Sequence, residues 1–273
     1  MHKVQPNRSL SALTAASGRI DLWAAFPADI ADPALLQHYR DLLPPDETQR
    51  MQRLVRAVDR HRFLITRALT RSVLSRYLSI GAKDLTFAKN QYGRPYLSNS
   101  DMLVPTLTFN ITHTHDLVLL GVTDQRTLGI DVESARRHAA TIGIANRYFS
   151  PAECAALNNL PASQQQDRFF AYWTLKESYI KARGMGLSIP LDQFSFGLSG
   201  KGEIDLTVEE SLGDRASRWQ FWQLALADEF LTAVCFSHED QELPGLAIRK
   251  IVPLVSEEPL AHSTIAASHG WPL

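Results

Sequence analysis

The stretch GIDVE, residues 129–133, decides how the fold is interpreted, because its polar and apolar residues alternate as in a β-strand. Successive side chains of a strand point to opposite faces, so Asp131 and Glu133 share one face while Ile130 and Val132 share the other. At about 3.3 Å per residue, the two carboxylates would lie roughly 6–7 Å apart. Either this is an edge strand with a solvated acidic face, or the two carboxylates share a cation.

A third carboxylate follows in a helix that the sequence predicts over residues 167–183. Glu177 and Lys181 stand at i and i+4 and therefore share one face of that helix. A surface ion pair between them, worth about 0.3–0.5 kcal/mol, is one interpretation. The other is that Asp131, Glu133 and Glu177 together hold Mg²⁺, which prefers oxygen ligands and completes its shell with water and substrate phosphates.

The composition is that of a globular protein with no strong charge. The chain has 273 residues, 45% of them hydrophobic, and a formal net charge of −1. This balance argues against a surface devoted to nucleic acid or to an anionic membrane. Two isolated cysteines, Cys154 and Cys235, support neither a disulfide framework nor a thiolate zinc site. With no apolar run of 18 residues and no signal-peptide pattern, we expect a cytoplasmic protein without a membrane span.

Basic residues gather in one place despite this balance. Residues 50–76 contain eight arginines and one acid, Asp59. Most of them fit a solvated helix face, which we expect for Arg53, Arg56, Arg67 and Arg71. The remaining arginines could hold a phosphate group through bidentate contacts.

The stretch FNITHTHD, residues 109–116, predicts a strand that places Thr112 and His113 on opposite faces. His113 and His115 at i and i+2 could bind a metal ion, but no third ligand at a matching spacing is near. A histidine that donates a hydrogen bond to a phosphate fits the stretch better.

Both halves of the chain are expected to run strand, helices, then strands, which predicts an α+β protein with two similar lobes. The prediction divides the chain into a flexible segment at 1–18, one lobe at 19–127, a second lobe at 128–240, and a mobile tail at 241–273 rich in proline and serine. Strands are expected at 20–24, 85–88, 106–112, 117–122, 129–133, 194–197, 219–226 and 231–236, and helices from Asp46 through residue 74, at 145–158 and at 167–183.

Taken together, five stretches resemble the Sfp-type 4′-phosphopantetheinyl transferases, which modify carrier proteins. They span about two thirds of the chain, and GID followed by WxxKExxxK at this separation is highly specific for that family, whereas YGRP alone means little. The stretches are YGRPYL at 92–97, FNITHTHD at 109–116, GIDVE at 129–133, RYFSPAE at 147–153 and WTLKESYIKARGMGL at 173–187.

The resemblance implies a pseudo-dimer of two lobes, each a small, mostly antiparallel sheet packed against helices, with coenzyme A between them. It implies transfer of the 4′-phosphopantetheine arm of coenzyme A to a serine of an apo acyl or peptidyl carrier protein, dependent on Mg²⁺, with release of 3′,5′-ADP. The carrier would serve fatty acid, polyketide or nonribosomal peptide synthesis, and the enzyme would be a monomer with an internal pseudo-twofold axis.

The resemblance also assigns residues, position by position. Glu47 departs from it, because relatives often carry lysine there; Arg50 and Arg53 could then hold the 3′-phosphate instead. The implied metal ligands are Asp131, Glu133 and Glu177; the implied catalytic residues are Glu177 as general base, Lys181, and Glu153 as a second candidate base; the implied coenzyme A contacts are Arg50, Arg62, Gly93, Arg94, Pro95, Thr112, His113, Lys176 and Lys181.

A carrier with an acidic, partly apolar helix would need a complementary surface. We expect it between the GIDVE strand and the catalytic helix, at Arg136, Arg137, Ile142, Ile144, Arg147 and Phe149. Two other functions use similar residues: a magnesium-dependent nuclease or phosphodiesterase, active without coenzyme A, and a carrier-binding module without catalysis. The second would be expected to have lost Asp131, Glu177 or Lys181, and all three are present.

Overall fold

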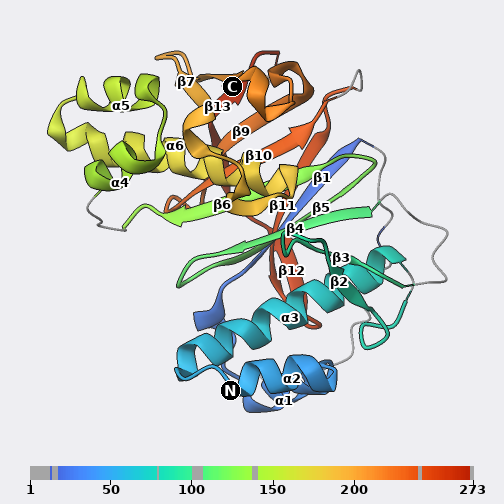
Figure 1. Ribbon diagram of the computed structural model, residues 1–273. Coiled ribbons are helices and arrows are strands. Elements are labelled where there is room, and N and C mark those ends of the chain that lie inside the picture. The colour runs from blue at the N-terminus through green and yellow to red at the C-terminus, as the bar shows by residue number, and fades with distance from the viewer. Residues whose placement is uncertain are drawn as a thin grey trace.

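The computed structural model describes residues 13, 18–78, 80–99, 107–136, 141–238 and 242–270, apart from the side chains of residues 141 and 142. The predicted flexible segment at 1–18 lies almost wholly outside these residues. The described chain forms two lobes, one above the other in Figure 1, each with a sheet and a long helix against it.

The N-terminal lobe is built on a five-stranded sheet in the order β12-β11-β1-β5-β4. The long helix α3 packs on it, and Trp23, Ile65, Leu69 and Val118 are wholly buried between them. The first strand and the helical region agree with prediction, while α1 was not predicted. Elements of this lobe are β1 Arg19–Ala25, the 3-10 helix Pro27–Asp29, α1 Pro33–Asp41, α2 Pro45–Gln52, α3 Ala57–Leu78, β2 Phe87–Lys89, β3 Pro95–Leu97, β4 Leu107–His113 and β5 Val118–Asp124.

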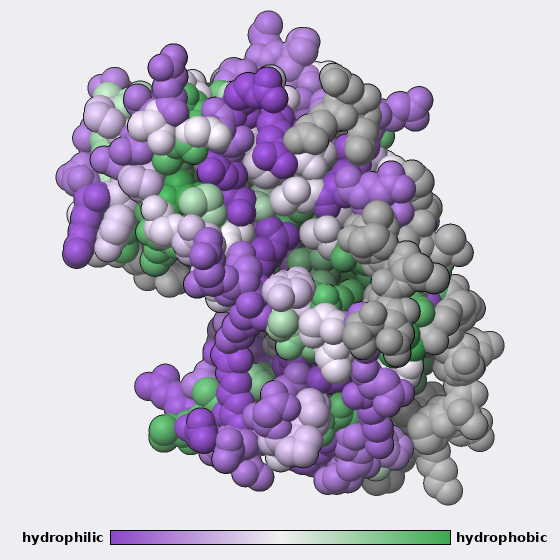
Figure 2. All heavy atoms as spheres, turned by 45° about the vertical axis from the view of Figure 1, so that its right-hand side comes forward, coloured by the Kyte–Doolittle hydropathy of each residue, from purple (hydrophilic) through white to green (hydrophobic). Residues whose placement is uncertain are grey.

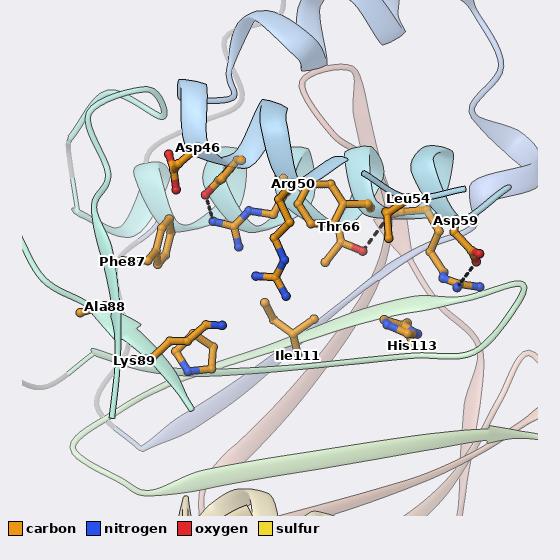
Figure 3. A pocket seen from close by; sticks show the side chains of 15 residues that line it. Asp46, Arg50, Leu54, Asp59, Thr66, Phe87, Ala88, Lys89, Ile111 and His113 are labelled. Carbon is orange, nitrogen blue, oxygen red and sulfur yellow. Dashed lines mark hydrogen bonds and ion pairs between the residues drawn. The ribbon is translucent and has the colours of Figure 1, made fainter. Parts of the chain in front are cut away.

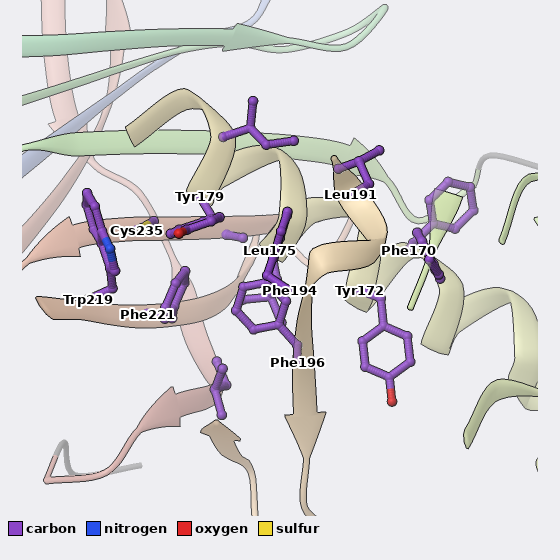
Figure 4. Close-up of a cluster of buried hydrophobic side chains, with 14 of the residues drawn as sticks. Phe170, Tyr172, Leu175, Tyr179, Leu191, Phe194, Phe196, Trp219, Phe221 and Cys235 are labelled. Carbon is purple, nitrogen blue, oxygen red and sulfur yellow. The ribbon is translucent and has the colours of Figure 1, made fainter. Parts of the chain in front are cut away.

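The C-terminal lobe has a six-stranded sheet in the order β6-β10-β9-β13-β8-β7. An aromatic core fills the space between this sheet and α6, with Tyr179, Phe194 and Phe221 packed together in Figure 4. Elements are β6 Leu128–Ser134, α4 Thr141–Tyr148, α5 Pro151–Asn158, α6 Ala162–Arg183, β7 Phe194–Leu198, β8 Glu203–Val208, β9 Trp219–Leu226, β10 Phe230–Ser237 and the 3-10 helices Gly186–Ser188, Leu191–Gln193, Glu210–Leu212 and Ala216–Arg218.

The prediction of a mobile tail is wrong for residues 245–268, which form three strands: β11 Gly245–Val252, β12 Ser256–Pro259 and β13 His262–Ser268. β11 pairs in parallel with β1 in the N-terminal lobe, and β13 inserts beside β9 in the C-terminal lobe. The prolines and serines of this region suggested a tail, but its apolar residues are buried. Ile248 packs between the two sheets, and Ile251 packs in the core of the N-terminal lobe. The C-terminal segment thus joins both sheets.

The two lobes repeat one topology, as predicted. In each, a strand is followed by a 22-residue helix and then by an antiparallel strand pair, so β1, α3, β4 and β5 correspond to β6, α6, β9 and β10. A third apolar cluster, which includes Leu22, Leu119, Ile130, Trp222 and Leu224, lies between the two sheets. The two lobes therefore share an apolar interface.

One further observation bears on the membrane question. None of the helices in the described ranges combines the length and the apolar character needed to cross a bilayer.

Candidate active site between the lobes

Gly129 lets β6 lie directly against helix α6. A Cβ atom at this position would overlap the Ser178 carbonyl oxygen and the Ala182 amide nitrogen and would come within 2.9 Å of the Ala182 Cα. These are backbone atoms, which cannot move aside as a flexible side chain can. The glycine of GIDVE is therefore required for the close approach that brings the carboxylates of β6 to the polar face of α6.

Asp131 is the centre of the polar contacts made by this approach. Its Oδ1 accepts a hydrogen bond from the Lys181 ammonium at 2.6 Å and another from the Thr112 hydroxyl at 3.1 Å. Its Oδ2 is buried and has no hydrogen-bond partner. Both Asp131 and Glu133 are less than a tenth exposed, so the alternative of a solvated acidic face is wrong even though β6 is an edge strand.

Glu177 lies near both of these carboxylates. Burial raises its pKa, and the negative charges of Asp131 and Glu133 raise it further, while the Lys181 ammonium lowers it. Lys181 pairs with Asp131, so the interpretation of an isolated Glu177–Lys181 surface pair is not what the structure shows.

These residues fit a hard cation by their chemistry. An orphaned buried carboxylate oxygen and a neighbouring carboxyl with a raised pKa both indicate uncompensated negative charge. In the present side-chain arrangement, no three His, Cys, Asp or Glu side chains of the described residues are grouped so that they could hold a metal ion. The Lys181 ammonium instead neutralises Asp131.

A cavity lies in the N-terminal lobe, between the helices α2 and α3 and the strands β2 and β4 (Figure 3). His113 and Ile111 line both this N-terminal cavity and a neighbouring acidic cavity, which is also lined by Asp131, Glu133 and Lys181, so the two cavities adjoin. The lining residues of the N-terminal cavity are Asp46, Glu47, Arg50, Leu54, Asp59, Arg62, Phe63, Thr66, Arg67, Phe87, Ala88, Lys89, Pro95, Ile111 and His113.

Most charged groups of the N-terminal cavity are already paired. Arg62 contacts Asp59 at 2.6 Å, and Arg67 forms an ion pair with Glu47. Glu47 also accepts two hydrogen bonds from Arg71, at 2.9 and 3.1 Å. Burial raises the pKa of Glu47, but hydrogen bonds from the two arginines and their charges outweigh it, so the pKa is lowered.

The expectation of a solvated helix face is therefore wrong for two arginines. Arg71 is 2% exposed and Arg67 lines the cavity, whereas Arg53 and Arg56 are exposed as predicted. Sequence reasoning missed the role of Glu47, whose carboxylate makes burial of the two arginines possible.

His113 stands at the junction of the two cavities. Desolvation lowers its pKa, and the nearby Arg62 charge lowers it further. This favours a neutral imidazole, which can donate one hydrogen bond to an oxygen anion.

The residues of the predicted loop at 93–95 lie in different surroundings. Pro95 lines the N-terminal cavity, and Gly93 adopts φ 90°, which a side chain would strain. Arg94 does not line the cavity: its guanidinium donates to the carbonyls of Lys181, Ala182 and Leu128 at 2.6–2.9 Å. The side chain of Arg94 thus joins the two lobes, and its predicted contact with coenzyme A stays a prediction.

Lys176 and Glu153 are also absent from both of these cavities. They form an ion pair at 2.7 Å and each is 1% exposed. The Lys176 ammonium further donates to the carbonyls of Leu191 and Phe194, each at 2.7 Å, and Glu153 accepts the Phe196 N–H at 2.9 Å. Lys176 and Glu153 thus form a buried structural pair away from both cavities, which does not match their predicted roles at coenzyme A and as a second base.

Figure 2 shows an indentation between the lobes, bordered by hydrophilic residues. Two family profiles match the chain on either side of this division. Residues 127–235 match the 4′-phosphopantetheinyl transferase superfamily, and residues 32–125 match the N-terminal region of 4′-phosphopantetheinyl transferases.

Curated relatives match over most of their length. The chain is 31% identical to the 4′-phosphopantetheinyl transferase Sfp of Bacillus subtilis, over 75% of this chain and 86% of that protein. It is 33% identical to the 4′-phosphopantetheinyl transferase HetI of a Nostoc species, over 81% of this chain and 89% of the relative. A phosphopantetheinyl transferase of Thraustochytrium is 27% identical over 77% of this chain.

The chain belongs to the 4′-phosphopantetheinyl transferase family. It is a transferase of a family that uses coenzyme A as substrate and acts on carrier proteins. The N-terminal cavity and the acidic cavity of this transferase adjoin at His113, which lines both.

Proposed function

We propose that this transferase binds coenzyme A across the two cavities and moves its 4′-phosphopantetheine arm to a carrier-protein serine beside Asp131, Glu133 and Glu177. The observation that carries the proposal is the buried, unpartnered Oδ2 of Asp131 in the acidic cavity, which adjoins the N-terminal cavity at His113. The oxygens of a diphosphate and of the carboxylates are all negatively charged, so a cation is needed between them.

Mg²⁺ is the cation that the donor set suits, and Asp131, Glu133 and Glu177 are the residues that would hold it. When bound, it would neutralise charge that develops on the diphosphate. The Lys181 ammonium pairs with Asp131, which places it where it could also contact a substrate phosphate.

Glu177 is the proposed general base. In the transfer, the serine oxygen forms a bond to the phosphorus that carries the pantetheine arm, and the bond from that phosphorus to the oxygen of 3′,5′-ADP breaks. The serine proton passes to the Glu177 carboxylate, directly or through a water. Lys181 and Thr112 would lie near the oxygen of the leaving 3′,5′-ADP, since both lie within hydrogen-bond distance of the Asp131 carboxylate.

The carrier protein would dock on the exposed residues next to β6. Arg136 and Arg147 are exposed, and Ile144 is 37% exposed, which suits an acidic and partly apolar helix. Phe149 is excluded from this surface, because it is 4% exposed in the core. Arg137 and the side chain of Ile142 lie outside the described residues.

The same proposal places the enzyme in the cytoplasm as a monomer, acting in fatty acid, polyketide or nonribosomal peptide synthesis.

Intact mass measurement tests the proposed function. The protein is incubated with coenzyme A, Mg²⁺ and a panel of apo acyl and peptidyl carriers, and each carrier is weighed before and after. We expect a gain of one phosphopantetheine group on at least one carrier, and loss of most of that gain in Glu177→Gln. No gain on any carrier would contradict the proposed function.

Two controls narrow the interpretation. Thermal unfolding of Glu177→Gln should match the wild type, which separates loss of chemistry from loss of fold. Near-normal transfer by this variant would leave the function intact but remove Glu177 from the role of base. Hydrolysis of nucleic acid in the absence of coenzyme A would favour the nuclease alternative instead.

A further inference from the structure

The last turn of α6 is capped by the N-terminal lobe. The last four carbonyls of a helix have no partner within the helix and need donors from elsewhere, and a positive charge is favourable beside them. The Arg94 guanidinium donates to the carbonyls of Lys181 and Ala182 at 2.8 and 2.6 Å. The Asn90 amide donates to the carbonyl of Gly184, just after the helix, at 2.7 Å. A turn of one lobe thus supplies the donors for the helix of the other.

The same guanidinium also contacts the start of β6. Its Nη2 donates to the Leu128 carbonyl at 2.9 Å, while its Nη1 donates to the Ala182 carbonyl. Leu128 precedes Gly129, whose lack of a side chain lets β6 lie against α6 at Ala182. Arg94 therefore bridges, from the N-terminal lobe, the contact between the two elements that bear the acidic centre.

The turn that carries Arg94 is held by its own hydrogen bonds. The side-chain oxygen of Asn90 accepts the N–H groups of Tyr92 and Arg94 at 3.0 and 2.9 Å. The Asn90 N–H donates to the Arg94 carbonyl at 3.0 Å. The residues on either side of the turn, Lys89 and Pro95, line the N-terminal cavity. The turn therefore lies between that cavity and the end of α6.

We propose that Arg94 is a positioning residue for the transfer, an inference that rests on the proposed function. It holds the end of α6, which carries Lys181, against β6, which carries Asp131, and so sets the contact between these two side chains. Both Nη atoms of Arg94 donate to backbone carbonyls, and Arg94 lines neither the N-terminal nor the acidic cavity. A positioning role therefore separates Arg94 from the binding of coenzyme A.

Separate measurements of binding and turnover test this inference. Coenzyme A is titrated calorimetrically, and transfer at saturating coenzyme A is followed by mass, for wild type, Arg94→Ala and Arg126→Ala. In Arg94→Ala we expect kcat to fall about 100-fold, as for a displaced catalytic group, while the dissociation constant of coenzyme A changes less than about threefold. Arg126 is the matched control, because this buried arginine also donates to backbone carbonyls, those of Ser237 and Glu242, which lie outside α6. Arg126→Ala should leave kcat nearly unchanged.

Amide hydrogen exchange gives a second readout that does not depend on transfer. The Gly184 N–H donates to the Ile180 carbonyl at 2.9 Å at the end of α6. Its exchange should become about tenfold faster in Arg94→Ala, because charge-assisted hydrogen bonds at this helix end are lost. The same exchange rate should be unchanged in Arg126→Ala.

A conservative variant completes the test. Arg94→Lys keeps a cation near the α6 carbonyls but not the planar fork, so its kcat should lie between those of wild type and Arg94→Ala. If Arg94→Ala does not fold, Arg94→Lys carries the same comparison, with kcat lowered and coenzyme A affinity kept.

Three results would overturn the inference: a loss of coenzyme A affinity as large as the loss of kcat, a wild-type kcat in the Arg94 variants, or an equal loss of kcat in Arg126→Ala. Failure of the proposed function is distinct, since it would show as absence of mass gain on every carrier with the wild-type protein.

Discussion

Each lobe contains a buried ion pair that is built in the same way, with a glutamate from a short helix and a cation from the long helix; we call this arrangement the polar frame. In each, an eight-residue helix begins with proline and has glutamate as its third residue, Glu47 in α2 and Glu153 in α5. Each glutamate pairs with a buried cation, Arg71 in α3 and Lys176 in α6. Each cation stands 14 residues after the first residue of its 22-residue helix.

The frame extends to the next strand in both lobes. Arg71 donates to two backbone carbonyls, both at 2.9 Å, and Lys176 donates to two, both at 2.7 Å. The first residue of the following strand, Phe87 in β2 and Phe194 in β7, lies beneath the cation, at 5.2 and 4.2 Å from the ring centroid. The correspondence is therefore local and chemical, not only topological.

The two polar frames differ in the exposure of the glutamate and in its additional contacts. Glu153 is 1% exposed and its remaining contacts are the N–H groups of Phe196 and Ser150, so the C-terminal frame is closed. Glu47 is 8% exposed, lines the N-terminal cavity and binds the additional cation Arg67. The N-terminal frame is therefore open to a cavity, whereas the C-terminal frame is enclosed.

The largest expected effect comes from breaking the closed frame. Glu153→Gln leaves the Lys176 ammonium buried without a counter-charge, which should lower the free energy of unfolding by about 3–5 kcal/mol. Chemical denaturation measures this loss. Adding Lys176→Met should recover part of the stability, because the buried charge is then removed. A stable Glu153→Gln variant that had lost transfer would return Glu153 to the catalytic residues.

Gly129→Ala breaks the contact that positions the C-terminal site. The new methyl group meets backbone atoms of α6, so we expect a loss of about 3 kcal/mol in unfolding free energy and little residual transfer. Gly143→Ala is the matched control, since a Cβ at that helical position meets nothing within 4 Å. Equal stability of the two variants would show that β6 and α6 are not in this close contact.

Breaking the open frame should cost less. Glu47→Gln leaves Arg71 with its two carbonyl acceptors and leaves Arg67 beside an open cavity, so we expect a loss of about 1–3 kcal/mol, smaller than for Glu153→Gln. Denaturation of the two variants under one condition makes the comparison. A larger loss at Glu47 would reverse the assignment of open and closed frames.

Acid should affect the open frame through the same glutamate. The folded-state pKa of Glu47 lies below its ordinary value of 4.5, so Glu47 stabilises the fold fully above about pH 4.5 and loses this effect as the pH falls through its folded-state pKa. Glu47→Gln should flatten this part of the stability curve. Asp214, with a lowered pKa in the C-terminal lobe, should keep its own contribution in that variant. An unchanged acid slope would contradict the lowered pKa.

The smallest effect concerns carrier recognition. Arg147→Glu, on the C-terminal lobe, should raise KM for the carrier about fivefold and leave KM for coenzyme A unchanged, because Arg147 is exposed and rim charges act mainly on encounter. Arg40→Glu, a change at an exposed arginine of the N-terminal lobe, is the control. Steady-state kinetics with both substrates would separate the two, and equal effects would remove the carrier from the C-terminal lobe.

Sequence reasoning could find the parts of the fold and site that depend on local pattern. The alternation of GIDVE predicted β6, Gly184 predicted the end of α6, and motif spacing predicted the family. Asp131 of β6, Thr112 of β4 and Lys181 of α6 were each placed on the correct element by pattern, and in the structure they meet.

Long-range pairing was beyond that reasoning. β11 is placed by its pairing with β1, more than 200 residues earlier, and its apolar residues lie within a region whose prolines and serines resemble a tail. Likewise, Arg71 looks solvated until Glu47 is placed beside it, and Lys176 looks like a site residue until its carbonyl acceptors are known. The repeated Pro-x-Glu at 45–47 and 151–153 was the one sequence signal that could have revealed both buried pairs.

The central claim is that the N-terminal lobe binds the nucleotide of coenzyme A while the carboxylates of the C-terminal lobe perform the transfer. Its most direct test is calorimetric titration of coenzyme A, without added metal, into wild type and Glu177→Gln, alongside mass-measured transfer with Mg²⁺. The account predicts dissociation constants that agree within about twofold while transfer falls by at least two orders of magnitude. Loss of coenzyme A binding together with transfer, or retention of transfer, would contradict it.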